Sequence, residues 1–411
     1  MKTSDSENEK TAPPLWQYVP IADYHPPAPP VTESVRERLA VFRRLFLHGE
    51  PEEESPFKAS DNLRALPAWQ SKRVAPSPEW HGSAEALTLE LTAWLKQEEP
   101  DRPAIVLVGP PHGGHSGTLA VWAEQQGWPI LPPPSTEQIL NGDDTWLSGQ
   151  SRSGSPWVFP ALERAYLRHA EGLNLIRRFL DRVCSGNLGR GIIGCDSWSW
   201  AFLRHVWRGR LPVTLTLQAF DKDRLADHFQ QIADPSGDRQ LLFRQSDNGR
   251  YVLKPPKTET STGAETSSFL QLLAAHSRGN LGVARAVWLA SLQTEPDEKL
   301  AEEPPDEGAP GMDGQTVWVL PWSQLSFPAL PSGAGRDEAF VLHTLLLHNG
   351  LPLELMQRLL PLAPSQVMET LLRLEDSGLA AQVDSVWQVA ARGYPAVRQF
   401  LQDNGYLIDQ F

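Results

Sequence analysis

A glycine-rich stretch at residues 109–116, GPPHGGHS, carries the clearest chemical pattern in the chain. It follows four apolar residues, 105–108, and apart from one position it has the spacing G-x-x-x-x-G-K-S/T of a phosphate-binding loop. Backbone N–H groups at such a turn converge on phosphate oxygens in front of a helix N-terminus, and glycines leave room for that approach. The sequence therefore predicts a strand, a loop and a helix in that order. The predicted nucleotide-binding residues of this stretch are Gly109, Gly113, Gly114, His115, Ser116 and Gly117.

The one position that departs from the motif is residue 115, where this chain has histidine and the motif has lysine. A lysine brings a permanent positive charge to the β- and γ-phosphates, whereas a histidine is shorter and mostly neutral at pH 7. The substitution favours nucleotide binding without turnover. The alternative is that residues 109–116 form a tight strand-to-helix turn and nothing more. His112 and His115 also make an H-x-x-H pair, but the glycines between them and the lack of a nearby acid or cysteine argue against a metal site.

A second candidate group follows the next predicted strand, in residues 156–163, PWVFPALE. A phosphate-loop enzyme needs an acidic strand end here, because an aspartate holds Mg²⁺ and a neighbouring glutamate polarises the attacking water. Pro160 takes the place of the aspartate and offers no ligand, and Glu163 comes shortly after it. Glu163 can take over one of the two roles but hardly both. The alternative is that Glu163 stabilises a helix N-terminus through the helix dipole.

Asp196 and Ser197 follow another predicted strand, residues 191–195. They stand at its carboxyl end, where open α/β sheets bind ligands. A residue that senses the γ-phosphate would be placed there. The rival role is simpler, because Asp and Ser are also the residues that cap the start of the next helix.

Arginines gather in residues 163–210, which hold nine arginines and four acids in a chain of net charge −13. Arg204, Arg208 and Arg210 come after the presumed sensing strand, and from there an arginine can reach a nucleotide held by an adjacent subunit. Such a role for Arg208 or Arg210 implies a ring or a dimer. The alternatives are that these arginines bind the acidic surface of a protein partner or form a solvated helix face.

The predicted elements around these groups alternate between helices and strands. A helix over residues 83–97, capped by Ser83, leads into the strand that carries the loop. Residues 241–254 predict a hairpin around an Asp-Asn-Gly turn, and residues 269–292 predict two helices. Further strands are predicted at residues 128–131, 157–159, 191–195, 213–217 and 316–320.

Composition limits the class of protein. A chain of 411 residues is long enough for two or three domains, and its net charge of −13 argues against a protein that coats nucleic acid. The polar start and the lack of an apolar run near ~20 residues predict no transmembrane segment and a soluble, cytoplasmic protein. Cys184 and Cys195 form no C-x-x-C pair, which suits a reducing compartment.

Residues 1–33 are charged and then proline-rich, which predicts a flexible or extended arm, followed by one helix at residues 35–47.

Taken in order, these motifs resemble AAA+ ATPases, and in particular their relatives with an appended winged helix, such as the origin-recognition type and the STAND signalling ATPases. The resemblance covers about residues 83–292, where residues 277–288, SRGNLGVARAVW, look like the helical lid. It implies ATP and Mg²⁺ as cofactors. The implied roles are Mg²⁺ contact for Ser116, the acidic strand end for Glu163, a first sensor for Asp196 or Ser197, a finger for Arg208 or Arg210, and a lid sensor for Arg285. His115 and Pro160 depart from the family where phosphate charge is neutralised and metal is held, so the resemblance implies an architecture more than an activity.

The last part of the chain predicts helix, helix, helix and hairpin, an order that resembles winged-helix domains. The predicted segments are residues 339–348, 353–359, 365–377 and the wing at 379–389. Residues 336–411 hold five arginines and nine acids, and the third helix carries Glu369, Glu375 and Asp376 against Arg373. Those acids would face phosphates in a major groove, so the sequence favours a protein-contact module over DNA binding.

The predicted fold is α/β, with a parallel-sheet P-loop NTPase core and helical lid followed by a small α+β winged-helix domain. The leading hypothesis is an AAA-like regulatory or scaffold protein that binds ATP weakly or not at all, with impaired or absent hydrolysis. The alternatives are an active ATP-hydrolysing AAA/STAND-type ATPase and a DNA-binding winged-helix regulator. The predicted divisions are an arm with one helix at 1–80, the core at 81–264, the lid at 265–293, an acidic linker at 294–315 and the winged-helix-like domain at 316–411.

Overall fold

The structure is a computed structural model that describes residues 14–28, 63–98, 100–148, 155–210, 212–235, 241–254, 266–295 and 316–411. The helix predicted at residues 35–47 and most of the acidic linker lie outside these described residues. Within the described part of the chain, no helix is both long and apolar enough to cross a bilayer.

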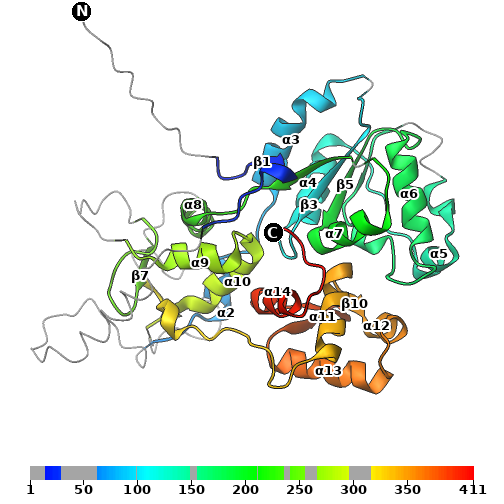
Figure 1. Cartoon of the computed structure of the whole chain (residues 1–411). Coiled ribbons are helices and arrows are strands. Elements are labelled where there is room, and N and C mark those ends of the chain that lie inside the picture. Colours follow the sequence, from blue (N-terminus) through cyan, green and yellow to red (C-terminus); the bar gives the residue numbers. More distant parts are fainter. Residues whose placement is uncertain are drawn as a thin grey trace, which may run out of the picture.

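A mostly parallel sheet forms the centre of the first part of the chain (Figure 1). Its order is β1-β6-β3-β5-β4, and all neighbours are parallel except β1, which runs antiparallel to β6. The bounds are β1 Tyr18–Pro20, β3 Ala104–Gly109, β4 Trp157–Phe159, β5 Gly191–Asp196 and β6 Val213–Leu217. Ile130 adds one parallel bridge to Val158 beyond β4. The strands predicted at residues 157–159, 191–195 and 213–217 are confirmed, whereas residues 128–131 contribute only the isolated bridge at Ile130. Part of the predicted arm lies on its own core as edge strand β1.

Helices cover both faces of this sheet, as Figure 1 shows. Ile105 and Leu107 of β3 pack in one cluster with α3 and α4, whereas the alternate residues Val106 and Val108 pack with α6 and α7 on the other face. Burial on both faces explains why β3 is apolar along its whole length. The bounds are α3 His81–Leu95, α4 His115–Gln126, α6 Asn174–Cys184 and α7 Ser197–Val206. Between them lie α5 Thr136–Asn141 and the short 3-10 turns Ile21–Asp23, Asp144–Leu147 and Leu162–Arg164.

Ser83 does not cap α3, contrary to the prediction. The helix begins earlier, at His81, and Ser83 lies inside it with its side chain buried. Its hydroxyl is 2.7 Å from the Tyr18 hydroxyl and 3.0 Å from the hydroxyl of Thr118 on α4. Ser83 therefore connects β1, α3 and α4 through its buried hydroxyl and does not act as a helix cap.

A second, smaller sheet has the order β2-β8-β9-β7 and packs with α2, α8, α9 and α10 around one hydrophobic cluster. Strand β9, predicted at the start of the winged-helix-like domain, pairs with β7 and β8 instead. The predicted boundary at residue 316 is thus wrong for this strand. The bounds are β2 Arg64–Ala65, α2 Ala68–Val74, α8 Lys222–Ala233, β7 Leu242–Gln245, α9 Phe269–Ser277, α10 Leu281–Ser291, β8 Leu292–Thr294 and β9 Thr316–Val319. The predicted hairpin is present, with Arg244 bridged antiparallel to Tyr251.

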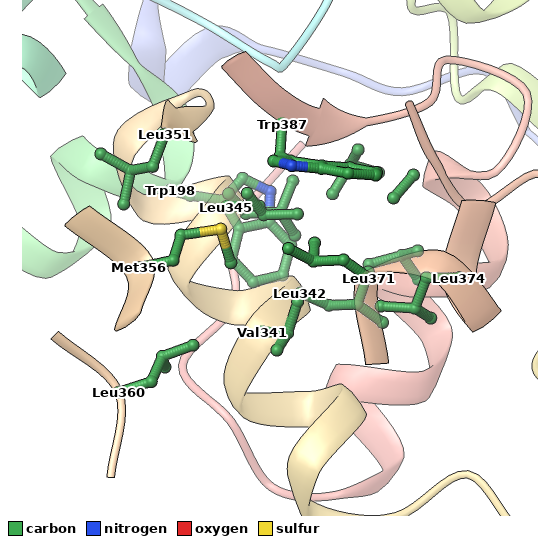
Figure 2. Close-up of a cluster of buried hydrophobic side chains, with 14 of the residues drawn as sticks. Trp198, Val341, Leu342, Leu345, Leu351, Met356, Leu360, Leu371, Leu374 and Trp387 are labelled. Atoms are coloured by element: carbon green, nitrogen blue, oxygen red, sulfur yellow. The ribbon is translucent and has the colours of Figure 1, made fainter. Parts of the chain in front are cut away.

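The C-terminal module, residues 336–411, contains helices and a small antiparallel sheet of order β10-β12-β11. Figure 2 shows its core, where Leu342, Leu345 and Trp387 pack together and Trp198 of the first part of the chain joins them. The bounds are α11 Arg336–His348, β10 Leu351–Pro352, α12 Leu353–Leu359, α13 Pro364–Asp376, β11 Ala380–Val383, β12 Val386–Val389 and α14 Tyr394–Asp403. The three helices and the hairpin are confirmed, and α14 is an addition that the sequence analysis missed. A short turn at Trp322–Gln324 precedes the module.

Candidate functional site

The glycine-rich loop joins β3 to α4 at the edge of the sheet where the parallel strands end. Gly114 stands at the N-cap of α4 with φ of 82°, and this helix has no side-chain cap. A Cβ at Gly114 would run into the indole ring of Trp80, and a Cβ at Gly117 would meet the same ring. Glycine at positions 114 and 117 therefore leaves room for Trp80, and at position 114 it also allows the left-handed backbone.

His115 points back toward the sheet. Its side chain is buried against Gly109, where an added Cβ would come within 2.9 Å of His115 Nδ1. His115 Nε2 lies 3.8 Å from Oε1 of Glu163, too far for a hydrogen bond, and neither ring nitrogen has a hydrogen-bond partner among the described residues. The residue at the lysine position thus faces a buried carboxylate.

Glu163 lies in the 3-10 turn after β4, and its side chain is 1% exposed. Its Oε2 accepts a hydrogen bond from the backbone N–H of Asp196 at 3.1 Å. Burial favours the neutral acid, but the nearby His115 ring and the backbone N–H groups of Glu163 and Asp196 outweigh it and hold the pKa of Glu163 below its ordinary value. The carboxylate is therefore charged. It lies beside His115 of α4 and accepts a hydrogen bond from the end of β5.

Asp196 ends β5 and caps α7, because its Oδ1 accepts a hydrogen bond from the N–H of Trp198 at 3.0 Å. The rival capping role is thereby confirmed for this residue. Its other carboxylate oxygen is buried with no hydrogen-bond partner in the described part of the chain. Burial first, and the charge of Glu163 second, raise the pKa of Asp196 well above its ordinary value. Ser197 donates a hydrogen bond to the buried carboxylate of Asp409.

The predicted arginines do not converge on the loop. Arg285 on α10 donates from Nε to the carbonyl of Pro76 at 2.9 Å and from Nη2 to that of Ala75 at 2.8 Å, at the end of α2. Arg208 and Arg210 are exposed beyond the end of α7, at the amino-terminal edge of the sheet, where Arg210 lies 3.4 Å from Asp101. Within one chain, the sheet separates these two arginines from the loop.

The tip of the loop contacts two other parts of the chain. The side-chain amide of Asn280, at the start of α10, donates to the carbonyl of Pro111 at 2.7 Å. His112 has a left-handed backbone with φ of 64°, and its Nε2 lies 2.9 Å from the carbonyl oxygen of Val389 on β12. A Cβ on Gly282 would collide with the His112 backbone, so α10 also lies directly on the loop.

These contacts leave little space beside the loop. The hollow beside the loop has a volume of about 20 Å³ and is lined by His115, Asn280, Tyr18, Tyr24 and Phe220 among others. That is room for about one water molecule, whereas small-molecule sites typically measure about 300–1,000 Å³.

Sequence reasoning missed Trp80, Asn280 and Val389 as partners of the loop. Asn280 carried a usable signal, because an asparagine between two predicted helices is a cap, and its Oδ1 does accept from the N–H of Gly282 at 3.1 Å. Trp80 and the Val389 carbonyl carried none. No group of His, Cys, Asp and Glu suited to a metal ion occurs within the described ranges.

Comparisons with known proteins give little further information. No protein-family model and no curated protein matches the chain. Among solved structures, the chain is similar to the Walker-type ATPase PABY2304 of Pyrococcus abyssi, with 11% sequence identity over 80% of this chain and 96% of that one. The TM-score of this likeness is 0.29.

Proposed function

We propose that the chain is an AAA-like P-loop-fold protein that has lost ATP hydrolysis and acts as a regulatory or scaffold protein through its C-terminal module. The observation that carries this proposal is the buried pairing of His115, which stands at the lysine position of the motif, with Glu163, 3.8 Å away and the first acid after the strand end where an ATPase needs a carboxylate for metal or water. In this chain these two positions face each other beneath the loop.

The arrangement of the sheet supports the architectural part of the proposal. The loop follows β3, which lies between β5 and β6, and Asp196 stands at the end of the adjacent β5. In an open parallel sheet the ligand site is expected at this edge, outside the carboxyl ends of the strands. This arrangement supports a P-loop-like framework for the chain.

The residues at that edge do not fit a magnesium–nucleotide group. His115 and Glu163 are both buried and directed at each other, and Arg285 uses Nε and Nη2 on carbonyl groups. Pro160 supplies no ligand side chain, and the hollow beside the loop, about 20 Å³, is far smaller than the sites that typically hold small molecules. Phosphoryl transfer relies on positioning and charge stabilisation, and losing a single such group typically costs about 3 kcal/mol of barrier. Losing both the lysine and the acid therefore removes many powers of ten in rate.

The charge of the module supports protein contacts over DNA binding. Glu369, Glu375 and Asp376 are exposed on α13, and the guanidinium of Arg373 is bound by Glu338 at 2.6 Å. A DNA backbone would meet uncompensated acids on this helix.

The decisive experiment measures phosphate release from MgATP by the purified full chain, with His115→Ala and His115→Lys variants beside it. We expect no release above the blank for the wild type and no rise in melting temperature with saturating MgATP. The His115→Lys variant tests whether the backbone of the loop can still hold phosphate. A melting temperature that MgATP raises in this variant but not in the wild type would mark the loop as a former phosphate site. Wild-type release that His115→Ala abolishes would overturn the proposal.

A further inference from the structure

The segment that follows α14, residues 406–411, crosses from the C-terminal module to the first part of the chain. In Figure 1 it is the red stretch that leaves α14 and runs toward α7. Asp409 and Phe411 within it are buried. The Phe411 ring lies 4.6 Å from that of Tyr24, in the segment that follows edge strand β1. The segment thus contacts both parts of the molecule at once.

Asp409 is one of the contacts between these two parts, beside those that α11 makes with the core. On the module side, Arg398 donates to its Oδ1 and Tyr394 to its Oδ2, each at 3.2 Å. On the core side, Ser197 at the start of α7 donates to the same carboxylate. The Trp198 indole donates to the Tyr394 hydroxyl at 3.0 Å and closes the network. A buried charge is tolerable only while its partners stay in place, so this network is made or broken as a unit.

Phe411 continues the connection toward the loop. Arg278, in the turn between α9 and α10, donates from Nε to the Phe411 carbonyl at 2.9 Å, and the Tyr24 hydroxyl donates to the Arg278 carbonyl at 3.4 Å. Two residues further along, Asn280 holds the carbonyl of Pro111. Tyr24 itself lines the hollow beside the loop. The segment therefore supports the turn that holds the loop tip.

The module also touches the loop directly, through the contact between His112 and the Val389 carbonyl. A left-handed backbone at a residue other than glycine is costly unless its surroundings hold it. His112, with φ of 64°, has such a backbone, and β12 of the module provides the contact. Movement of the module away from the core would remove that support.

We propose that residues 406–411 are a latch. While the latch is seated, the module stays on the edge of the sheet and the loop is closed, and when it leaves, the module and the loop tip at Pro111 and His112 are released together. The latch would govern the same module to which the proposed function assigns protein contacts, and it rests on that function in this respect alone. A hollow of about 390 Å³, lined by Ile21, Trp200, Arg204 and Leu407, runs beside the segment and leaves one of its sides open.

Hydrogen–deuterium exchange of the full chain, without nucleotide, tests the proposal. In the Asp409→Asn variant we expect peptides covering residues 109–118 and 386–392 to exchange at least about tenfold faster than in the wild type, while β3 and β5 stay protected. The matched control is Asp403→Asn, because Asp403 is exposed and bound by Gln399 within α14. The control should exchange like the wild type.

Faster exchange confined to residues 406–411, with the loop unchanged, would overturn the latch. If Asp409→Asn loses protection in β3 and β5 as well, the milder Phe411→Ala variant decides, since it removes the ring contact and leaves the carboxylate network. Faster loop exchange in that variant supports the latch, and unchanged loop exchange overturns it. Because no nucleotide is present, ATP hydrolysis by the wild type would refute the proposed function without altering this result.

Discussion

His115 Nε2 lies 3.8 Å from Oε1 of Glu163, and both side chains are buried beneath the glycine-rich loop. The pair joins the first turn of α4 to the turn after β4, and the N–H of Asp196 adds the end of β5. The pair and the hydrogen bond from Asp196 therefore connect three elements of the fold.

Replacing the carboxylate tests that role. We expect Glu163→Gln to lower the free energy of unfolding by about 1–3 kcal/mol, because the amide keeps an acceptor for Asp196 but loses the charge beside His115. Urea denaturation measures this, with the exposed Glu171→Gln as the control. In a double-mutant cycle with His115→Gln, a coupling energy of at least about 0.5 kcal/mol is expected. Strict additivity would mean that the two side chains do not interact.

Gly114 provides a second test, with a matched control within the same helix. Gly114 and Gly127 flank α4, both with positive φ, but a Cβ at Gly114 would meet Trp80 whereas nothing lies within 4 Å of one at Gly127. We expect Gly127→Ala to cost about 1–2 kcal/mol for the backbone alone and Gly114→Ala clearly more. Thermal unfolding measures both. In a Trp80→Ala background the excess at Gly114 should disappear, and an excess that persists would contradict the contact.

The framework of the site was predictable because short-range sequence patterns determine it. The buried run of β3, the glycines after it and the Asp196 cap depend on neighbours a few residues away. The contacts that close the site are not local. His112 meets Val389 across 277 positions, Ser197 meets Asp409 across 212, and Arg285 meets Ala75 across 210. No periodicity or motif links such pairs, so the sequence predicted a loop but not what covers it.

The same distinction applies to β9. Its run of apolar residues, 317–320, correctly predicted a strand, yet its partners β7 and β8 lie on either side of α9 and α10 in the sequence. An element's type follows from its own residues, whereas its sheet follows from the packing of the whole chain.

Arg285 allows a structural role to be separated from a sensing role. We expect Arg285→Lys to lower the free energy of unfolding by about 1–2 kcal/mol, because a lysine cannot span the carbonyls of Ala75 and Pro76 with a planar fork. The change should be the same with and without MgATP, as seen by thermal unfolding. Replacement of the exposed Arg204 by lysine is the control. A stabilisation by MgATP in the wild type that this variant loses would instead mark Arg285 as a nucleotide sensor.

The final prediction concerns pH and the interface between α11 and the first part of the chain. Burial is the main cause that lowers the pKa of His343 and of His348 from 6.5 to about 4, and the charge of Arg168 adds to it. Between about pH 4 and pH 6.5 the unfolded chain therefore binds more protons at these residues than the folded chain. Their contribution to stability is complete above pH 6.5 and is lost as the pH falls toward 4, by at most about 3 kcal/mol for each histidine.

Asp196 and Asp409 have raised pKa values, and they oppose this trend because their contribution to stability falls as the pH rises. The comparison is therefore made between the wild type and His343→Gln, in which Asp196 and Asp409 remain. Glutamine keeps an acceptor for Arg168, whose Nη1 lies 3.2 Å from His343 Nδ1, but it does not titrate. In denaturation experiments from pH 4 to pH 7, the stability of the wild type relative to the variant should rise with pH. The exposed His169→Gln variant should follow the wild type throughout. A flat difference between wild type and His343→Gln would mean that His343 has an ordinary pKa in the folded chain.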